Sequence, residues 1–204
     1  MAQYFDNVDL KSEIKQITVK IFDTVLKLNT DNGVFSKDKL DFGTRLLLEN
    51  LPLDEFNGKV LDIGCGYGPI GLYLKKVTPC SVDMTDVNRR CLHLSEMNAK
   101  LNSLDVHIFE SNAYENISDK YNMIVTNPPI RVGKEILYSI VMGAKDYLVT
   151  GGSLFLVIHK DQGAKSMIID LKKYYDVSIL AKNKGFFIIR CDFRWLVDEI
   201  VLII

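Results

Sequence analysis

Three glycines at alternate positions follow an acidic residue in the segment Asp62-x-Gly64-x-Gly66-x-Gly68. The hydrophobic pattern predicts a strand over 59–63 just before them and a helix over 69–77 just after them. Glycines at such a junction let the backbone turn tightly and approach a ligand without a Cβ in the way. In open α/β sheets, ligands bind beyond the carboxyl ends of the strands. Residues 64–68, called the glycine loop below, therefore predict a small-molecule site.

A second group of residues, Asn127-Pro128-Pro129-Ile130, follows a strand predicted over 122–126. The side-chain carbonyl of an asparagine and the backbone carbonyl after it are two acceptors, which can hold both N–H groups of a planar amine. Such contacts favour a more tetrahedral nitrogen and aim its lone pair, and orientation of this kind can lower a barrier substantially. The prolines stiffen the loop because each fixes its own φ. These residues are therefore suited to presenting a planar nitrogen to an electrophile.

Two kinds of cofactor compete for the glycine loop. Residues 66–71 match the GxGxxG fingerprint of dinucleotide-binding proteins, and Asp86 lies 20 residues after Gly66, where a ribose-binding acid is expected. In that fingerprint the strand runs directly into the first glycine, whereas Asp62-Ile63-Gly64-Cys65 intervenes here. The longer string resembles the first motif of class I S-adenosylmethionine-dependent methyltransferases. A carboxylate beside it also suits an ammonium group better than a pyrophosphate.

The resemblance implies S-adenosylmethionine as the cofactor and roles for individual residues. The loop backbone packs on the methionine part, and the acid Asp62 organises its amino end. Asp86 matches the acid after the second strand that takes the ribose hydroxyls, with Asp83 as its rival and a helix N-cap as its structural alternative. The implied cofactor-binding residues are Asp62, Gly64, Cys65, Gly66, Gly68, Asp86, Asn112, Ala113 and Asn127, of which Asn112 and Ala113 match the adenine-contact position.

Residues 127–130 resemble the NPP motif of methyltransferases that act on exocyclic amines of adenine or guanine, or on the glutamine side-chain amide. The implied catalytic residues are Asn127, Pro128, Pro129 and Ile130. The fourth position of this motif is usually aromatic, so that a flipped base can stack on it. Here the base is expected to pack on the aliphatic Ile130 or to stack on Phe35.

Four further segments, 33–44, 130–134, 159–164 and 184–190, resemble the catalytic domain of the bacterial small-subunit ribosomal RNA guanine-N2 methyltransferase family in its single-domain form. The resemblance covers roughly residues 1–190 and implies ribosomal RNA or the small ribosomal subunit as the partner. It places residues 35–44 over the cofactor pocket. The implied substrate-binding residues are Phe35, Ser36, Asp41, Thr44, Arg131, Lys134, Lys160 and Lys184.

Several alternatives stay open. An enzyme for adenine N6 in DNA would usually need a recognition domain, and a glutamine methyltransferase would usually carry an aromatic residue after the two prolines. A non-catalytic RNA-binding or assembly protein would have no need of Asp62, Asp86 and Asn127 together. A dehydrogenase would bind NADH in preference to S-adenosylhomocysteine.

The elements that must position these residues alternate between strand and helix from residue 59 onward, which predicts an α/β, Rossmann-like fold with helices on both faces of the sheet. The last two strands are joined by a short turn and must be antiparallel, so the sheet of seven strands is mixed. A β-hairpin is predicted over 16–29. The expected strands cover 59–63, 81–85, 106–110, 122–126, 153–158, 177–182 and 185–190, and the expected helices 41–50, 69–77, 87–101, 135–148 and 164–175.

Length and composition fit one globular domain. The 204 residues are 48% hydrophobic and 25% charged, which excludes a disordered chain. We predict a methyltransferase domain over 1–190, with a hairpin and lid segment over 1–50 and a core over 51–190, and a tail of unknown role over 191–204. No apolar run is long enough for a bilayer, and the N-terminus is unlike a secretory signal. The four cysteines suggest neither zinc nor disulfides, so a cytoplasmic protein without metal is expected. The oligomeric state stays open, and a monomer is favoured.

The net charge of −1 first argues against a nucleic-acid partner. Its distribution changes that conclusion. Residues 51–130 carry a net charge of −3, whereas residues 131–190 carry 10 basic and 5 acidic residues, a net charge of +5. We therefore expect a local basic face on the substrate side, with lysines available for phosphate contacts.

Overall fold

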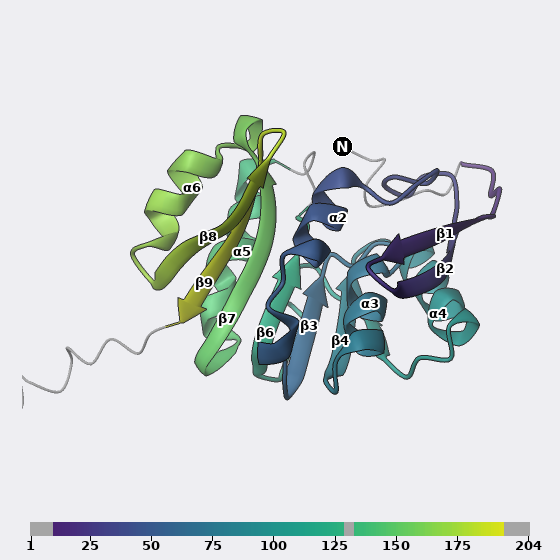
Figure 1. Cartoon of the computed structure of the whole chain (residues 1–204), viewed down its shortest axis with the longest axis horizontal. Helices are drawn as coiled ribbons and strands as arrows, with labels where there is room; N and C mark the ends of the chain where they lie inside the picture. The colour runs from purple at the N-terminus through teal and green to yellow at the C-terminus, as the bar shows by residue number, and fades with distance from the viewer. Residues whose placement is uncertain (1–9, 129–132, 194–204) are drawn as a thin grey trace, which may run out of the picture.

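The structure is a computed structural model, which describes residues 10–128 and 133–193. Seven strands form one mixed sheet in the order β5-β4-β3-β6-β7-β9-β8 (Figure 1). They are β3 (Lys59–Ile63), β4 (Ser81–Asp86), β5 (His107–Glu110), β6 (Tyr121–Thr126), β7 (Leu148–His159), β8 (Tyr175–Asn183) and β9 (Phe186–Phe193). Strands β3 to β7 pair in parallel, and β9 runs antiparallel between β7 and β8. The strand order reverses beside β3, which is where open α/β sheets bind their ligands.

Helices cover both faces of the sheet, as the alternation of strands and helices predicts. The helices are α2 (Phe42–Glu49), α3 (Pro69–Val77), α4 (Arg89–Leu101), α5 (Lys134–Gly143) and α6 (Ala164–Leu171), with short 3-10 turns η1 (Leu53–Glu55), η2 (Ala144–Asp146) and η3 (Lys160–Gln162). Neighbouring strand residues point into opposite cores: Val60 packs with α2, α3 and α4, whereas Leu61 packs with α5 and α6. The predicted Rossmann-like fold is confirmed.

The N-terminal hairpin forms a separate two-stranded antiparallel sheet of β1 (Lys15–Ile21) and β2 (Thr24–Thr30). Its inward residues Val19, Ile21, Leu26 and Leu28 are buried in the same core as α3 and α4. Figure 1 shows the hairpin beside these two helices and α2 above the ends of the central strands. The hairpin thus anchors the start of residues 31–41, which connect β2 to α2.

Several element ends differ from their predicted positions. Helix α4 begins at Arg89 rather than 87, because Asn88 is its N-cap and accepts the N–H of Arg90. Helix α5 ends at Gly143, and β7 already begins at Leu148, where an irregularity in its pairing with β6 separates the two regular parts of the strand. Strand β9 continues to Phe193, so the first residues of the predicted tail belong to the sheet. Residues 194–204 lie outside the described residues.

Candidate functional site

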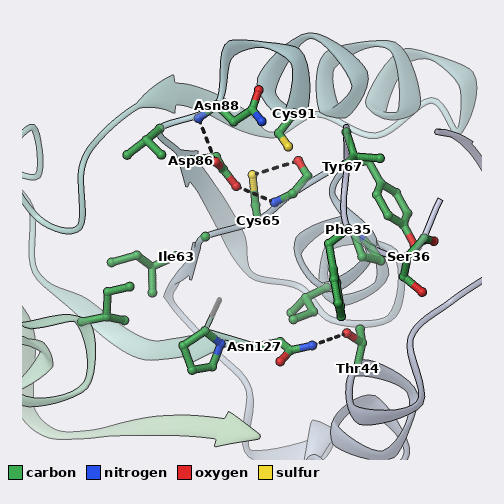
Figure 2. Close-up of a pocket in the computed structure, with 18 of the residues that line it drawn as sticks. Phe35, Ser36, Thr44, Ile63, Cys65, Tyr67, Asp86, Asn88, Cys91 and Asn127 are labelled. Atoms are coloured by element: carbon green, nitrogen blue, oxygen red, sulfur yellow. Dashed lines mark hydrogen bonds between the residues drawn. The ribbon is translucent and has the colours of Figure 1, made fainter. Parts of the chain in front are cut away.

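A cavity of about 930 Å³ lies at the carboxyl ends of the central strands. Its wall is formed by the glycine loop after β3, the ends of β4, β5 and β6, the lid segment (residues 31–41), the first turns of α2, α3 and α4, and α5. In Figure 2 Asp86 and Asn127 lie at opposite ends of this cavity, with Ile63 between them. A cavity of this size fits a small-molecule site, whose usual volume is about 300–1,000 Å³.

The glycine loop presents bare backbone to the cavity. The N–H groups of Gly64 and Cys65 both donate to the Thr85 carbonyl, at 2.8 and 2.9 Å, which fixes the loop to the end of β4. Gly66 has φ +58°, a conformation that favours glycine, and a Cβ built there would meet no atom within 4 Å. Because Gly66 lines the cavity, a ligand can lie directly against its backbone.

Asp86 ends β4 and lies in the cavity wall. Its Oδ2 accepts the N–H of Gly66 at 2.9 Å and its Oδ1 accepts the N–H of Asn88 at 2.9 Å (Figure 2). Burial raises the pKa of Asp86, and these backbone donors oppose the rise. Its rival Asp83 is buried away from the cavity, where it accepts the hydroxyl of Tyr121 at 2.7 Å and pairs with Lys59.

Asp62 lies beneath the glycine loop and outside the cavity wall, so its role in organising the amino end of the cofactor stays a prediction. Its side chain is fully buried, and its Oδ2 accepts the N–H of Gly71 at 2.8 Å. Its Oδ1 has no hydrogen-bond partner among the described residues. Burial raises the pKa of Asp62 to about 7, although the Gly71 N–H opposes this. Gly68 also lies outside the wall, because it is the N-cap of α3 and packs on Met84.

Asn127 follows β6 and is held by the start of α2. Its Nδ2 donates to Thr44 Oγ1 at 2.8 Å (Figure 2). The same Nδ2 donates to Asp41 Oδ2 at 3.1 Å. Asp41 is the N-cap of α2 and accepts the Thr44 N–H with the same oxygen. An ionised carboxylate can only accept hydrogen bonds, so the group of Asn127 that faces it must be the NH₂. The carbonyl Oδ1 of Asn127 is therefore the atom left for a ligand.

The lid segment brings an aromatic ring to the same cavity. Phe35 lines the wall with 48% of its surface exposed, and its side chain points into the hollow between Tyr67 and Asn127 (Figure 2). Ser36 also lines the wall, and its carbonyl accepts the hydroxyl of Tyr67 at 3.5 Å. An exposed ring in a ligand cavity can stack on a planar ligand.

The remaining predicted residues are only partly brought together. Asn112 and Ala113 line the cavity after β5, and Cys65 and Pro128 line it as well. Lys160 and Lys184 lie outside the wall. The Lys184 ammonium stands 4.8 Å from the centre of the Phe42 ring, next to the N-cap of α2. Pro129, Ile130 and Arg131 lie outside the described residues, as does the side chain of Lys134.

Some residues of the wall were missed by the sequence analysis. They include Tyr67, Asn88, Cys91, Ile136 and Ile140. Tyr67 lies inside the glycine loop, and Asn88 and Cys91 follow Asp86 closely, so their position in the sequence was an available signal. Ile136 and Ile140 sit one helical turn apart on α5, a spacing that equally fits a core stripe. Only the fold distinguishes the two roles.

Residues 10–128 and 133–193 contain neither a metal-binding cluster nor a membrane-spanning helix. No group of three or more potential ligands that could hold a metal ion occurs there. Nor does that part of the chain contain a helix with the length and apolar character needed to cross a membrane. All four cysteines are buried and free.

A model of the family described as "Methyltransferase small domain" matches residues 25–190, from the hairpin to β9. The chain belongs to this family. Membership confirms the predicted methyltransferase and goes against a dehydrogenase. The match begins within β2 and ends within β9, so it includes every described residue of the cavity wall except Leu10.

Relatives within the methyltransferase small domain family span different lengths. Uncharacterized protein YbxB of Bacillus subtilis (strain 168) is 38% identical over 192 residues, which are 92% of this chain and 96% of the relative. Ribosomal RNA small subunit methyltransferase C of Psychromonas ingrahamii is 34% identical over 183 residues, which are 87% of this chain and 52% of that protein. The chain spans about half the length of this ribosomal RNA methyltransferase.

A solved structure with the same fold is the 16S rRNA N2 methyltransferase RsmC of T. thermophilus, in complex with AdoMet and guanosine. The two chains superimpose with a TM-score of 0.81 at 25% identity, over 91% of this chain and 52% of the other. The seven-stranded methyltransferase fold is thus shared, and here too the chain corresponds to about half of its neighbour.

Proposed function

We propose that this methyltransferase transfers the methyl group of S-adenosylmethionine to an exocyclic amine, the N2 of guanine in small-subunit ribosomal RNA. The observation that carries the proposal is the orientation of Asn127. Its NH₂ is engaged by Thr44 and Asp41, so its carbonyl oxygen is the atom left to accept an amine N–H from a ligand in the cavity.

The residues of the wall fit S-adenosylmethionine. The Cβ that Gly66 lacks would project into open space in the cavity, so the backbone leaves room for the cofactor there. Each carboxylate oxygen of Asp86 already accepts one backbone N–H and retains capacity for a ribose hydroxyl. Asn112 and Ala113 line the cavity where they could contact the adenine of the cofactor. Asp62 acts indirectly, because it fastens the first turn of α3 behind the loop.

When bound, the cofactor supplies an electrophilic methyl group on a sulfonium. The chain's own residues orient the acceptor nitrogen toward it. The Asn127 Oδ1 accepts one amine N–H, and the Pro128 carbonyl is the second acceptor that the motif provides. These two contacts favour a tetrahedral nitrogen, whose lone pair points out of the base plane. The product nitrogen then loses a proton to solvent, so no general base is required.

Ribosomal RNA is supported as the partner by charge and by relatives. Ribosomal RNA small subunit methyltransferase C is named for that substrate, and RsmC was solved with guanosine. In this chain the exposed Lys184 lies beside the N-cap of α2, and the exposed Lys160 donates its backbone N–H to the carbonyl of the neighbouring Gly185. Phosphates flanking a target base would pass there. Phe35 would stack on the base. We further propose that the protein acts in the cytoplasm, in keeping with its free, buried thiols. We also propose that it acts as a monomer.

The test is methyl transfer from labelled S-adenosylmethionine to small-subunit ribosomal RNA and, in parallel, to the assembled subunit. Wild-type protein is expected to label one of them, and Asn127→Ala to lose most of the rate even at saturating cofactor, which separates its role in transfer from its predicted part in cofactor binding. Equal transfer by Asn127→Ala contradicts the mechanism. Labelling of adenine or of a protein glutamine in place of guanine contradicts the substrate.

A further inference from the structure

One face of α4 carries residues that reach two different parts of the site. Positions 91, 95, 98 and 102 are spaced by four, three and four residues, so they share one side of the helix. This side, called the α4 polar face, consists of Cys91, Ser95, Asn98 and Asn102. Cys91 lines the cavity, and the Ser95 hydroxyl donates to the Gly66 carbonyl at 2.9 Å. The face therefore supports the glycine loop from behind.

Asn98 joins the glycine loop to the hairpin. Its Nδ2 donates to the Tyr67 carbonyl at 2.8 Å and to the Asn29 carbonyl at 3.0 Å. Its Oδ1 accepts the N–H of Asn29 at 2.6 Å. The side chain is fully buried, so loss of the amide would leave a buried carbonyl in the glycine loop and part-buried backbone groups of β2 without this partner. The side-chain amide of Asn98 thus forms hydrogen bonds with a glycine-loop carbonyl and with the backbone at the edge of β2.

Asn102 repeats half of this arrangement one turn further along α4. Its Oδ1 accepts the N–H of Lys27 at 3.1 Å, and its Nδ2 donates to the Lys27 carbonyl at 2.7 Å. Lys27 and Asn29 are alternate residues of β2, so the two asparagines cover the same edge of the strand as a neighbouring strand would. None of the hydrogen bonds described for Asn102 reaches the glycine loop. It therefore docks the hairpin without joining it to the cofactor side.

The hairpin continues directly into the lid. The Thr30 hydroxyl at the end of β2 donates to the Lys37 carbonyl at 2.6 Å, which closes the base of the lid segment. Phe35 and Ser36 lie between these two residues and line the cavity. The lid then ends at Asp41, which holds Asn127. A displacement of β2 relative to the glycine loop would therefore be passed to the target-base end of the cavity.

We propose that Asn98 is a positioning residue that couples the glycine loop to the hairpin and lid, so that cofactor binding orders the pocket for the target base. This inference rests on the proposed function. Coupling between two sites is reciprocal, so a base bound under the lid strengthens cofactor binding by the same factor. An asparagine that merely stabilises the fold would protect the hairpin equally with and without cofactor.

The experiment is hydrogen exchange of the full chain with and without S-adenosylhomocysteine, followed in segments 26–31 and 64–70. In wild type, the ligand is expected to slow exchange in both segments, by about fivefold or more in the hairpin. In Asn98→Ala, slowing is expected to persist in the glycine loop and to disappear from the hairpin. In the matched control Asn102→Ala, basal exchange at Lys27 rises but the ligand still slows the hairpin.

The outcomes separate this inference from the proposed function. Slowing of the glycine loop without slowing of the wild-type hairpin overturns the coupling and leaves the function standing. Equal slowing of the hairpin in wild type and Asn98→Ala also overturns it. No response in either wild-type segment means that the cofactor is not bound, which overturns both. The wild-type comparison needs no substitution, so it can still overturn the coupling if Asn98→Ala does not fold.

Discussion

Thr44→Val removes one of the two acceptors that hold the Asn127 amide. Valine has the same branched shape as threonine, so the packing of this buried position in α2 is kept. The Thr44 hydroxyl oxygen lies 2.8 Å from Asn127 Nδ2, whereas Asp41 Oδ2 remains at 3.1 Å. The substitution therefore loosens the catalytic amide without removing it.

The expected effect follows from the value of one buried hydrogen bond. Losing it should raise the activation free energy of methyl transfer by about 1–2 kcal/mol, because the amide is oriented less firmly. This corresponds to a fall of about 5- to 30-fold in the rate. Affinity for S-adenosylhomocysteine should stay near that of wild type, because the glycine loop and Asp86 are untouched. The loss should therefore appear in the chemical step.

Single-turnover transfer to ribosomal RNA with saturating cofactor measures that step, and calorimetry measures cofactor affinity. Thr44→Ser is the matched control, because it keeps the hydroxyl and should retain most of the rate. If Thr44→Val transfers methyl groups as fast as Thr44→Ser, the hydroxyl does not orient Asn127 and the reasoning is refuted.

Three further predictions concern the glycine loop, the buried Asp62 and the exposed lysines. Gly66→Ala should weaken S-adenosylhomocysteine binding by about tenfold or more, because its Cβ enters the cavity. The control is Gly151→Ala on β7, where φ is also positive at +75° and an added Cβ meets open space. It should lower the melting temperature about as much as Gly66→Ala does, without affecting binding. Burial raises the pKa of Asp62 to about 7 in the folded protein, whereas its unfolded value is near 4. The free energy of unfolding should therefore fall as pH rises from about 4 to 7, by up to about 4 kcal/mol, and this group should lower it no further above pH 7. Asp62→Asn should therefore flatten this part of the stability profile in denaturant titrations, and an unchanged profile would contradict the raised pKa. Lys184→Ala should reduce the slope of log affinity for ribosomal RNA against log salt concentration by about 0.7, which is the value for one phosphate contact in a single strand. The control Lys172→Ala, at the exposed C-cap of α6, should leave the slope unchanged.

The sequence predicts the sheet and the glycine loop well because both depend on local signals. Alternating strand and helix patterns define the parallel core, and the short turn before Phe186 requires the antiparallel edge. Element ends are less predictable: Asn88 replaces Asp86 as the cap of α4 because Asp86 turns toward the glycine loop. Local patterns contain no information about such competition for one side chain.

The site could be predicted in its residue types but only partly in its roles. Asp41, Thr44 and Asn127 are all recognisable as candidates, yet their contact joins residues 83 and 86 positions apart and depends on the fold. Asp62 is identified as important, but its burial beneath the loop makes it an anchor for Gly71. Asn98 lies on a helix without a motif, and its two partners lie on separate elements.

The central claim is that Asn127 presents the N2 amine of guanine in small-subunit ribosomal RNA to S-adenosylmethionine. Its most direct test is mass spectrometry of nucleosides from ribosomal RNA incubated with cofactor and either wild-type protein or Asn127→Ala. We predict that N2-methylguanosine accumulates with wild type and falls to background with the variant. Methylation of another nucleoside, or equal N2-methylguanosine with both proteins, would contradict the account.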